Sequence, residues 1–526
     1  MVRLERVAMD GSSDFHAEDF GSDAFRPGDA WRVVTAQRAA VLIDSGAYFA
    51  AAMAALHRAR RSVLLLGWGF DPRTRLTPDA EGNPNGPDEI GVLLPRLAAL
   101  RPELDIRVLI WKSALPISAS QRFFPHRARW GFLGTRVRFE LDAATPFGAC
   151  HHQKVLVVDD CVAFVSGGDF GVDRWDSTGH RDHDMRRVMP GGARHAPRHE
   201  TTMLVDGDAA RALGDLARRR WARAGLRPPA PVDPADRDVE RHDPWPHMIA
   251  PQWRQARIAI ARTEPAWRGR PEVREIEALH LDAIRHARRT IYLENQYFTS
   301  VPVGEALAER LAEPDGPDVV LISSAHSPSY FDRWTMDRTR WKLIERLKAA
   351  DRHGRFRAYC PHTSHGRPII VHSKVSVIDD VMLRVGSANL NHRSAGFDTE
   401  CDLALEAPPG SDQARTIEAV RARMVGHFLG MSGPHMEAAI AEHRGLVKAL
   451  DRLTEGGKAR LRPMQPLLMG PLARIISALH LGDPTSPADS FKPLLRRRLL
   501  DPAARALAGA RRKSGKVEVD NQGQVV

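Results

Sequence analysis

The sequence predicts an α/β protein built from two related halves, with a functional site between them and a helical tail after them. Two internal repeats lead to this expectation. Residues 55–70 align without gaps to residues 283–298, and the pattern His-x-Lys-x4-Asp occurs at 152–159 and again at 372–379. Alternating helices and strands are typical of α/β folds, and a repeat of this size indicates a duplicated unit.

The elements of each half follow the same order along the chain. Each copy of the first repeat has the pattern of an amphipathic helix end, a basic turn and a buried strand. Each His-x-Lys segment and the apolar run after it predict a hairpin that turns at two aspartates, at 159–160 and 379–380. The other predicted strands come in matched pairs, at 105–110 and 318–322, and at 137–140 and 356–359.

Composition sets the expected domain boundaries. We expect a disordered segment at 1–30, a first domain at 31–226, a linker at 227–250 and a second domain at 251–431. The linker is placed on the proline-rich stretch 227–234. Residues 432–526 no longer follow the repeat, and they predict a helical, basic C-terminal extension with a disordered end.

Net charge and cysteine content limit the classes of partner and cofactor that we expect for this protein. The 526 residues carry a net charge of +11, which favours anionic partners such as phospholipid surfaces, nucleic acids or phosphorylated metabolites. No export signal or membrane-spanning stretch is evident. The four cysteines form no CxxC pair, so we expect free thiols, and no carboxylate-rich or zinc-type cluster is evident, so we expect no metal and no other cofactor.

The two His-x-Lys motifs supply the candidate catalytic groups. Only 10 of the 76 basic residues are lysine, yet a lysine follows a histidine at the same spacing twice. Alternation along a strand places His152 with Lys154, and His372 with Lys374, on one face. One histidine can attack phosphorus to form a phosphohistidine while the other protonates the leaving oxygen, and the ammonium groups neutralise the phosphoryl oxygens.

Asp159 and Asp379 belong to the same motifs and stand with the candidate catalytic set. Strand alternation, however, sends both carboxylates to the opposite face, at the turn of each hairpin. We therefore interpret these two aspartates as structural or supporting residues rather than reacting groups.

A small-residue corner follows each hairpin. We expect Gly167 and Gly168 in the first half, and Ser387 and Asn389 in the second, to bind the substrate phosphate together with the two lysines. Asp169 occupies the position that matches Asn389, and it cannot donate a hydrogen bond while ionised. The two halves are therefore not equivalent.

A glutamate opens the next strand in each half, Glu200 in the first and Glu400 in the second. Such a carboxylate can fix a histidine tautomer and stabilise the imidazolium that forms during proton transfer. We therefore expect Glu200, Glu400 and Asp169 to support the site without touching the substrate.

These motifs resemble those of the phospholipase D superfamily over residues 30–430. The likeness rests on the paired His-x-Lys-x4-Asp, on 386–400 and 291–298, and on Gly-Gly-Asp at 167–169 followed by Arg-Trp-Asp at 174–176, as in the eukaryotic-type branch. It implies two pseudo-symmetric αβα sandwich domains with the active site between them. It also implies His152 as nucleophile and His372 as general acid, although Arg198-His199-Glu200 departs from the family's aromatic-His-acid trio.

The resemblance implies a phospholipase D that converts phosphatidylcholine-like lipids into phosphatidic acid and free headgroup, with transfer to alcohols. A cardiolipin-synthase-type phosphatidyltransferase and, third, a nuclease of the same superfamily are the alternatives, besides an inactive basic binding module. The sequence shows no stretch of interleaved aromatic and basic residues that would stack on bases, so a nucleic-acid substrate has no such support. We expect a monomer at a membrane surface, either cytoplasmic and peripheral or secreted by a route without a signal peptide.

Overall fold

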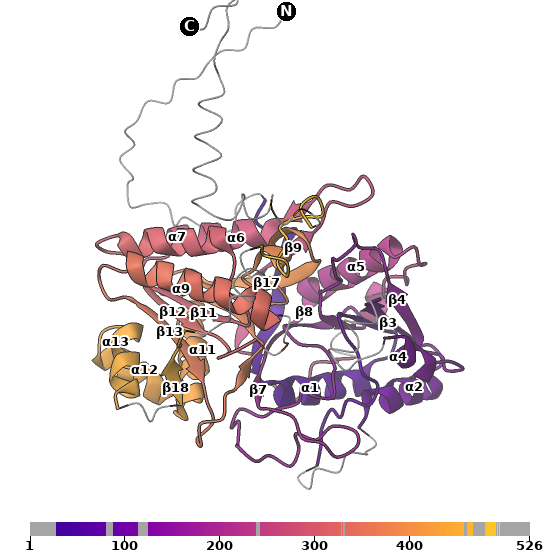
Figure 1. The fold of residues 1–526 in the computed structure, drawn as a ribbon. Helices are drawn as coiled ribbons and strands as arrows, with labels where there is room; N and C mark the ends of the chain where they lie inside the picture. Colours follow the sequence, from indigo (N-terminus) through magenta and orange to yellow (C-terminus); the bar gives the residue numbers. More distant parts are fainter. Residues whose placement is uncertain are drawn as a thin grey trace, which may run out of the picture.

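The computed structural model describes residues 28–79, 88–113, 125–237, 242–327, 329, 332–456, 460–466, 479–490, 492 and 494. Two α/β halves lie side by side, the first in indigo to magenta and the second in pink to orange (Figure 1). The first half contains β1 (Arg32–Ile43), α1 (Ser45–Arg58), β2 (Ser62–Gly67), α2 (Ile90–Leu100), β3 (Asp105–Trp111), α4 (Pro125–Gly131), β4 (Arg138–Asp142), β5 (Val155–Val158), β6 (Val162–Ser166), β7 (Arg198–His199), β8 (Thr201–Asp206) and α5 (Gly207–Arg223).

The second half repeats this order after a short 3-10 turn, η1 (Pro234–Arg237). Its elements are β9 (Trp253–Glu264), β10 (Val273–Arg274), α6 (Glu275–His286), β11 (Thr290–Asn295), α7 (Val301–Ala312), β12 (Asp318–Ile322), the π-helical turn η2 (Arg333–Asp337), α9 (Arg338–Ala350), β13 (Phe356–Pro361), β14 (Ile370–Val371), β15 (Lys374–Ile378), β16 (Met382–Gly386), α10 (His392–Gly396), β17 (Glu400–Glu406) and α11 (Asp412–Leu429).

One mixed sheet runs through both halves, and within the described residues it has 16 strands. Outward from the centre, the first half has the order β1-β8-β6-β5-β2-β3-β4 and the second has β9-β17-β16-β15-β11-β12-β13. The matched positions hold matched strands, so the α/β class and its internal repeat are as the sequence predicts. The predicted hairpins are present as β5–β6 and β15–β16.

The two halves join through their longest strands. β1 pairs antiparallel with β9, from Arg32 opposite Ile260 to Ala39 opposite Trp253. Neither strand is predicted from the sequence. Both carry arginines within their first few residues, and the apolar run follows only later, so neither has an even alternation along its length.

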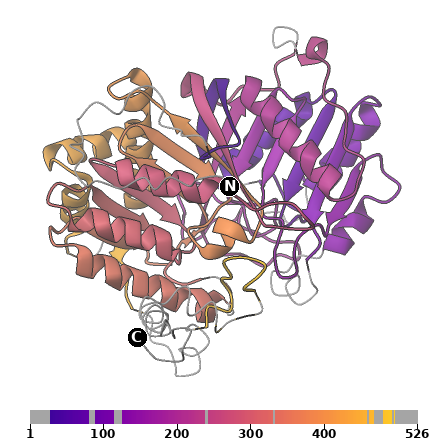
Figure 2. The same cartoon turned by 90° about the horizontal axis from the view of Figure 1, so that it is seen from above.

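Helices cover both faces of the sheet and close three apolar cores. In the first half α1 and α2 lie on one face and α5 on the other, and in the second half α6, α7 and α9 lie opposite α11 (Figures 1 and 2). The core beneath α5 and α11 is shared by both halves, because it continues across β1 and β9 through Trp253 and Ile258. The two halves therefore share one interior.

The chain beyond residue 432 adds to the second half. It forms α12 (Gly433–Glu442), α13 (Leu446–Thr454) and then β18 (Leu461–Pro463), which pairs with β13 and extends the sheet. The sequence analysis expects only helix there. The basic segments at 494–500 and 511–513 lie outside the described residues, apart from Leu494, and so do residues 1–27.

The four cysteines are free and buried, as the sequence predicts. Among the described helices, none is both long enough and apolar enough to cross a bilayer.

Candidate active site between the two halves

The segments that carry the two motif histidines cross from one half to the other. β14, which ends one residue before His372, pairs in parallel with β7 of the first half. His372 N donates to the carbonyl of His199 at 2.9 Å, and His152 N donates to the carbonyl of Thr399 at 3.0 Å. In both places the acceptor is the residue just before a glutamate, so each histidine is aligned beside the glutamate of the other half.

Each motif histidine consequently pairs with a carboxylate from the opposite half. His152 Nδ1 lies 2.8 Å from Glu400 Oε2, and His372 Nδ1 lies 2.8 Å from Glu200 Oε2. A carboxylate at Nδ1 fixes the tautomer that keeps the proton there and leaves Nε2 for chemistry. The sequence pattern predicts glutamates in this supporting position, but it does not indicate that they are exchanged between the halves.

The surroundings of the two His–Glu pairs lower the pKa of each histidine and raise the pKa of each glutamate, so both changes favour the uncharged form of the side chain. Burial, with added repulsion from Lys154 and Lys374, lowers the pKa of both histidines well below 6.5. Burial raises the pKa of Glu200 to about 7 and that of Glu400 to about 8. A neutral imidazole is the nucleophilic form, so the site holds its histidines ready to attack an electrophile.

The two lysines of the motifs are buried in the same site, in different environments. Lys154 Nζ lies 3.4 Å from Asp169 Oδ2 and donates to the carbonyl of His152 at 3.1 Å. Lys374 Nζ donates to the carbonyl of His372, and it lies 3.1 Å from His372 Nδ1 and 3.5 Å from both Gln296 Oε1 and the carbonyl of Gly167. None of these partners is a carboxylate. Burial lowers the pKa of Lys374 to about 7. Lys374 is therefore the less compensated cation of the two, and an incoming anion favours its charged form.

Gly167 and Gly168, which the sequence predicts to bind phosphate, lie directly against Glu200. A Cβ on Gly167 would lie 2.5 Å from Glu200 Oε1 and 3.0 Å from Lys374 Cδ, and a Cβ on Gly168 would collide with the Glu200 carboxylate. Neither position has room for a side chain, because the Glu200 carboxylate that contacts His372 lies close to the backbone of both glycines.

Ser387 and Asn389, at the matching corner of the second half, divide into two roles. The Ser387 hydroxyl donates to Glu400 Oε2 at 2.6 Å, so it holds the carboxylate rather than pointing at a phosphate. Asn389 is 7 % exposed, and among the described residues its side-chain Oδ1 has no hydrogen-bond partner. Oδ1 is an acceptor, so only the Nδ2 group of this amide can donate to a phosphoryl oxygen. Asp169, at the matching position, accepts from Trp68 N at 2.8 Å.

Asp159 and Asp379 lie at the hairpin turns, away from the histidines. Each carboxylate accepts three backbone hydrogen bonds of 2.7–2.8 Å. Residues 60–62, at the start of β2, donate to Asp159, and residues 288–290, at the start of β11, donate to Asp379. Both have left-handed backbone, with φ of 55° and 52°. Both aspartates shape the turn, as strand alternation predicts, and among the described contacts neither touches a motif histidine or lysine, which corrects their inclusion in the candidate catalytic set.

Comparison with known proteins agrees with this architecture. The family model described as "Cardiolipin synthase, PLD-like domain" matches residues 280–421. Phospholipase D alpha 4 of Arabidopsis thaliana is 24% identical over 460 residues, covering 67% of this chain and 59% of the relative. Phospholipase D2 of Bos taurus is 22% identical over 463 residues, covering 69% and 48%.

The similarity of this chain is to the phospholipase D superfamily.

One solved structure resembles this chain over nearly its whole length. The phosphatidylserine synthase of Haemophilus influenzae Rd KW20 superposes with a TM-score of 0.51 at 12% identity, covering 90% of this chain and 96% of that one. At this identity the likeness shows the fold alone. The chain spans about half to three-fifths of the length of the curated relatives named above.

Two further residues of this superfamily site were not singled out from the sequence. The Ser394 hydroxyl donates to Glu400 Oε1 at 2.6 Å, opposite Ser387, so that both oxygens of this carboxylate are held. Gln296 contacts Lys374. Both lie inside the segments 386–400 and 291–298 on which the family likeness rests, and that was the available signal.

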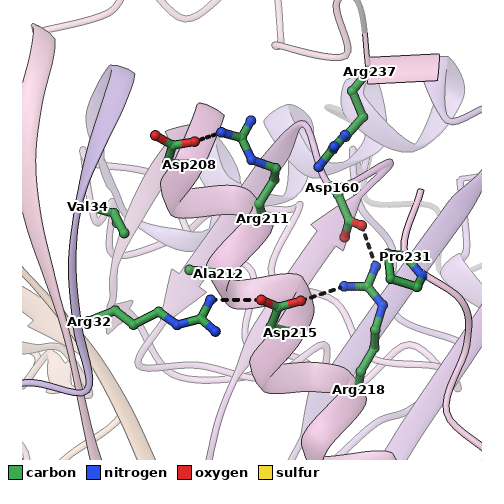
Figure 3. Close-up of a pocket in the computed structure, with 10 residues that line it drawn as sticks. All are labelled: Arg32, Val34, Asp160, Asp208, Arg211, Ala212, Asp215, Arg218, Pro231 and Arg237. Carbon is green, nitrogen blue, oxygen red and sulfur yellow. Dashed lines mark hydrogen bonds and ion pairs between the residues drawn. The ribbon is translucent and has the colours of Figure 1, made fainter. Parts of the chain in front are cut away.

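A surface cavity of about 310 Å³ lies apart from the histidines, between β1, α5 and η1 (Figure 3). Its charged side chains neutralise one another: Arg32 pairs with Asp215 at 2.7 Å, and Arg218 pairs with both Asp215 and Asp160. These ion pairs join α5 to β1 and to the β5–β6 turn, and Val232 N of the linker donates to Asp160 at 3.1 Å. We assign them no role in the chemistry of the histidine site.

Proposed function

We propose that this protein is a phospholipase D that hydrolyses phosphatidylcholine-like glycerophospholipids to phosphatidic acid and free headgroup, through a phosphohistidine on His152. One observation carries the proposal: His372, which is buried, and His152, which is partly buried, are each oriented by a glutamate from the opposite half and lie in one site with Lys154 and Lys374. The curated relatives that cover two thirds of the chain are named as phospholipases D, which supports the lipid substrate.

The reaction uses these groups in two steps. His152 Nε2 attacks phosphorus and bonds to it, the bond to the headgroup oxygen breaks, and His372 Nε2 gives its proton to that oxygen. Water or an alcohol then loses its proton to His372, attacks phosphorus and frees His152. Lys374, Lys154 and the Asn389 amide stabilise the negative charge on the phosphoryl oxygens in both transition states.

The need for a protonated His372 fits the order of binding. Burial keeps the pKa of His372 low in the free protein. A bound phosphodiester brings negative charge beside the imidazole, and Glu200 lies behind it, so the substrate itself raises the pKa of His372 and supplies the acid form. General acid and substrate therefore arrive in the site together.

A phosphatidyltransferase of the cardiolipin-synthase type is the second candidate, because the matched family model carries that description. It would use the same phosphohistidine with a lipid alcohol as acceptor. The two candidates differ only in which nucleophile reaches the intermediate.

Product analysis separates these functions. Purified protein is incubated with phosphatidylcholine, phosphatidylglycerol or plasmid DNA in EDTA, with and without added ethanol. We expect phosphatidic acid from phosphatidylcholine, and diversion to phosphatidylethanol in proportion to the ethanol concentration. Cardiolipin from phosphatidylglycerol alone would favour the transferase, and cleaved DNA with untouched lipid would overturn both lipid functions.

Covalent trapping tests the roles of the histidines. His152→Ala and His372→Ala should each lower turnover by about 10³-fold or more, since the two act as a unit. With an activated p-nitrophenyl phosphodiester, whose leaving group needs no proton, the His372→Ala protein should accumulate the adduct. Mass spectrometry should find it on the peptide that contains His152, and an adduct on His372 in the reciprocal His152→Ala experiment would reverse the assignment.

A further inference from the structure

Behind Glu200, away from the reacting face, four ionisable side chains converge in the interior. They are Asp44 after β1, His180 in the loop before β7, His199 in β7 and His427 in α11, and each offers one ligand atom within 4.8 Å of the others. Their exposed fractions are between 0 and 8 %, counting the side chain of His427. Polar groups this deeply buried require partners for every donor and acceptor.

Two of the histidines face each other with like atoms. His180 Nδ1 lies 2.9 Å from Asp176 Oδ2, and His427 Nδ1 lies 3.0 Å from the carbonyl oxygen of Met424. Asp176 also accepts from Arg198 N and from Arg187, so it is an acceptor, as the carbonyl is. Both Nδ1 atoms therefore carry the proton, and both Nε2 atoms present a lone pair.

Those two Nε2 atoms are only 3.0 Å apart. Two lone pairs at that distance repel, and a positive charge between them removes the repulsion. His180 also has left-handed backbone, with φ of 39°, an uncommon conformation for a residue with a side chain. The surrounding structure thus holds the ring against its neighbour.

The carboxylate of Asp44 completes the same group. Its Oδ2 is buried, and among the described residues it has no hydrogen-bond partner, although His427 Nε2 is 3.7 Å away. Its Oδ1 lies 3.5 Å from His180 Nε2 and 2.8 Å from His199 Nδ1. A buried carboxylate that has one unpaired oxygen and lies beside two imidazole lone pairs is the arrangement of a ligand set.

The other ring nitrogens of all three histidines are occupied by acceptors. His199 Nε2 lies 2.7 Å from Glu294 Oε2, and the acceptors of His180 and His427 are Asp176 and Met424. Metal-binding histidines almost always donate their second ring N–H to a carboxylate or a backbone carbonyl in this way. Four nitrogen and oxygen ligands, with bonds of about 2.0–2.2 Å, suit tetrahedral zinc.

We propose that Asp44, His180, His199 and His427 bind one zinc ion in a closed structural site. Binding displaces the proton from His199 Nδ1 to solvent, and it forms bonds to His180 Nε2, His427 Nε2, His199 Nδ1 and one Asp44 oxygen. This site differs from the expectation of no metal, because its four residues are scattered along the chain and show no zinc-type spacing.

The position of the site gives the ion a positioning role. Asp44, His180 and His199 come from the first half and His427 from the second, so the ion links the halves. Asp44 N donates to the Glu200 carbonyl at 2.7 Å, and the His199 carbonyl accepts from His372 N at 2.9 Å. The ion therefore holds the backbone that aligns Glu200 with His372. This consequence, unlike metal binding itself, rests on the proposed function.

Metal content tests the site without any activity measurement. The full chain is expressed with zinc supplied, dialysed against EDTA, and analysed by inductively coupled plasma mass spectrometry. We expect about one zinc per chain that survives dialysis and is released by guanidinium unfolding. A metal-free chain that is folded and monodisperse would overturn the proposal, and would mean that a proton holds the cluster together.

Variants locate the ion. His427→Gln and Asp44→Asn should lose the zinc and lower the Tm, whereas His280→Gln, a change at another buried histidine, should keep it. Should the ligand variants fail to fold, cobalt substitution of the unaltered chain should give the intense visible absorption of tetrahedral coordination. Octahedral spectra, or zinc retained in His427→Gln, would overturn the assignment. If the protein turns over phospholipid but contains no zinc, only the zinc proposal is overturned. If it binds zinc but does not turn over phospholipid, only the proposed function is overturned.

Discussion

At the scale of single residues, the two motif histidines differ in how firmly their carboxylates are held. Glu400, which serves His152, accepts from the hydroxyls of Ser387 and Ser394 as well. Glu200, which serves His372, has glycines at the matching corner, and its Oε1 has no hydrogen-bond partner among the described residues. A nucleophile needs one fixed orientation, whereas an acid that must gain and lose a proton tolerates a less constrained partner.

Glu400→Gln should lower kcat by about 10²- to 10⁴-fold, because an amide no longer enforces the proton on His152 Nδ1. Steady-state kinetics with a short-chain lipid measure the effect, and KM should change little. Ser387→Ala removes only one of the hydrogen bonds to the same carboxylate, so it should cost far less. Equal losses in the two variants would contradict the tautomer role.

The pH profile should report on Lys374. Burial lowers its pKa from 10.5 to about 7, so the ammonium is present below pH 7 and is lost as the pH rises above it. We expect kcat/KM for the anionic substrate to fall by up to tenfold per pH unit above about pH 7, since this parameter reports the free enzyme. Bound phosphodiester raises the pKa of Lys374, so kcat should fall only at higher pH.

Lys374→Arg is the matched control for this profile. The guanidinium stays charged throughout the accessible range, so the alkaline fall should disappear from whatever activity remains. An unchanged alkaline limb in Lys374→Arg would assign the titration to another group.

At the scale of elements, the corner between β6 and β7 controls the approach of the first-half glutamate. Gly168 lies against the Glu200 carboxylate, so there is no room for a side chain. Glu200 in turn reaches His372 through the parallel pair of β7 and β14. The corner is therefore small for a reason of packing that the sequence pattern did not reveal.

Gly168→Ala should displace Glu200 and lower kcat by about 10-fold or more, while the chain stays folded, because tight-packing misplacements near 1 Å can cost up to 10²-fold. Circular dichroism and lipid turnover measure both properties. Gly131→Ala in α4 is the control, since a Cβ there meets nothing within 4 Å. A fully active Gly168→Ala protein would show that Glu200 is not needed at this position.

The local sequence pattern was sufficient to predict the helices and strands that occur in both halves. It was insufficient to predict the contacts between the halves. The strands after each helix end, both hairpins and the turn position of Asp159 and Asp379 follow from apolar runs and their alternation. Alternation indicates the face of a strand but not which half supplies the facing residue. The two-residue strands β7 and β14, and the His–Glu exchange that they produce, therefore had no readable signal.

At the scale of the whole molecule, one chain contains everything that one site needs. Both halves contribute a histidine, a lysine and a glutamate, and the shared core beneath α5 and α11 joins them through β1 and β9. We therefore expect a monomer to be the active unit.

Mixing two inactive variants tests this expectation. An equal mixture of His152→Ala and His372→Ala proteins should have no more activity than either alone, because each chain lacks one of its two reacting groups. Lipid turnover is measured after prolonged co-incubation, and again after joint unfolding and refolding. Recovery toward one quarter to one half of the normal rate would mean that two chains exchange halves to complete a site.

The crossed His–Glu pairs also limit how such a gene can be rearranged. A duplication ordinarily leaves two copies that are free to diverge, but here each copy supplies the carboxylate that the other copy's imidazole depends on, across 248 residues in one case and 172 in the other. Damage in one half therefore appears as a defect in the chemistry of the other. Chimeras that swap halves between relatives will work only where position 152 keeps its partner at 400 and position 372 keeps its partner at 200.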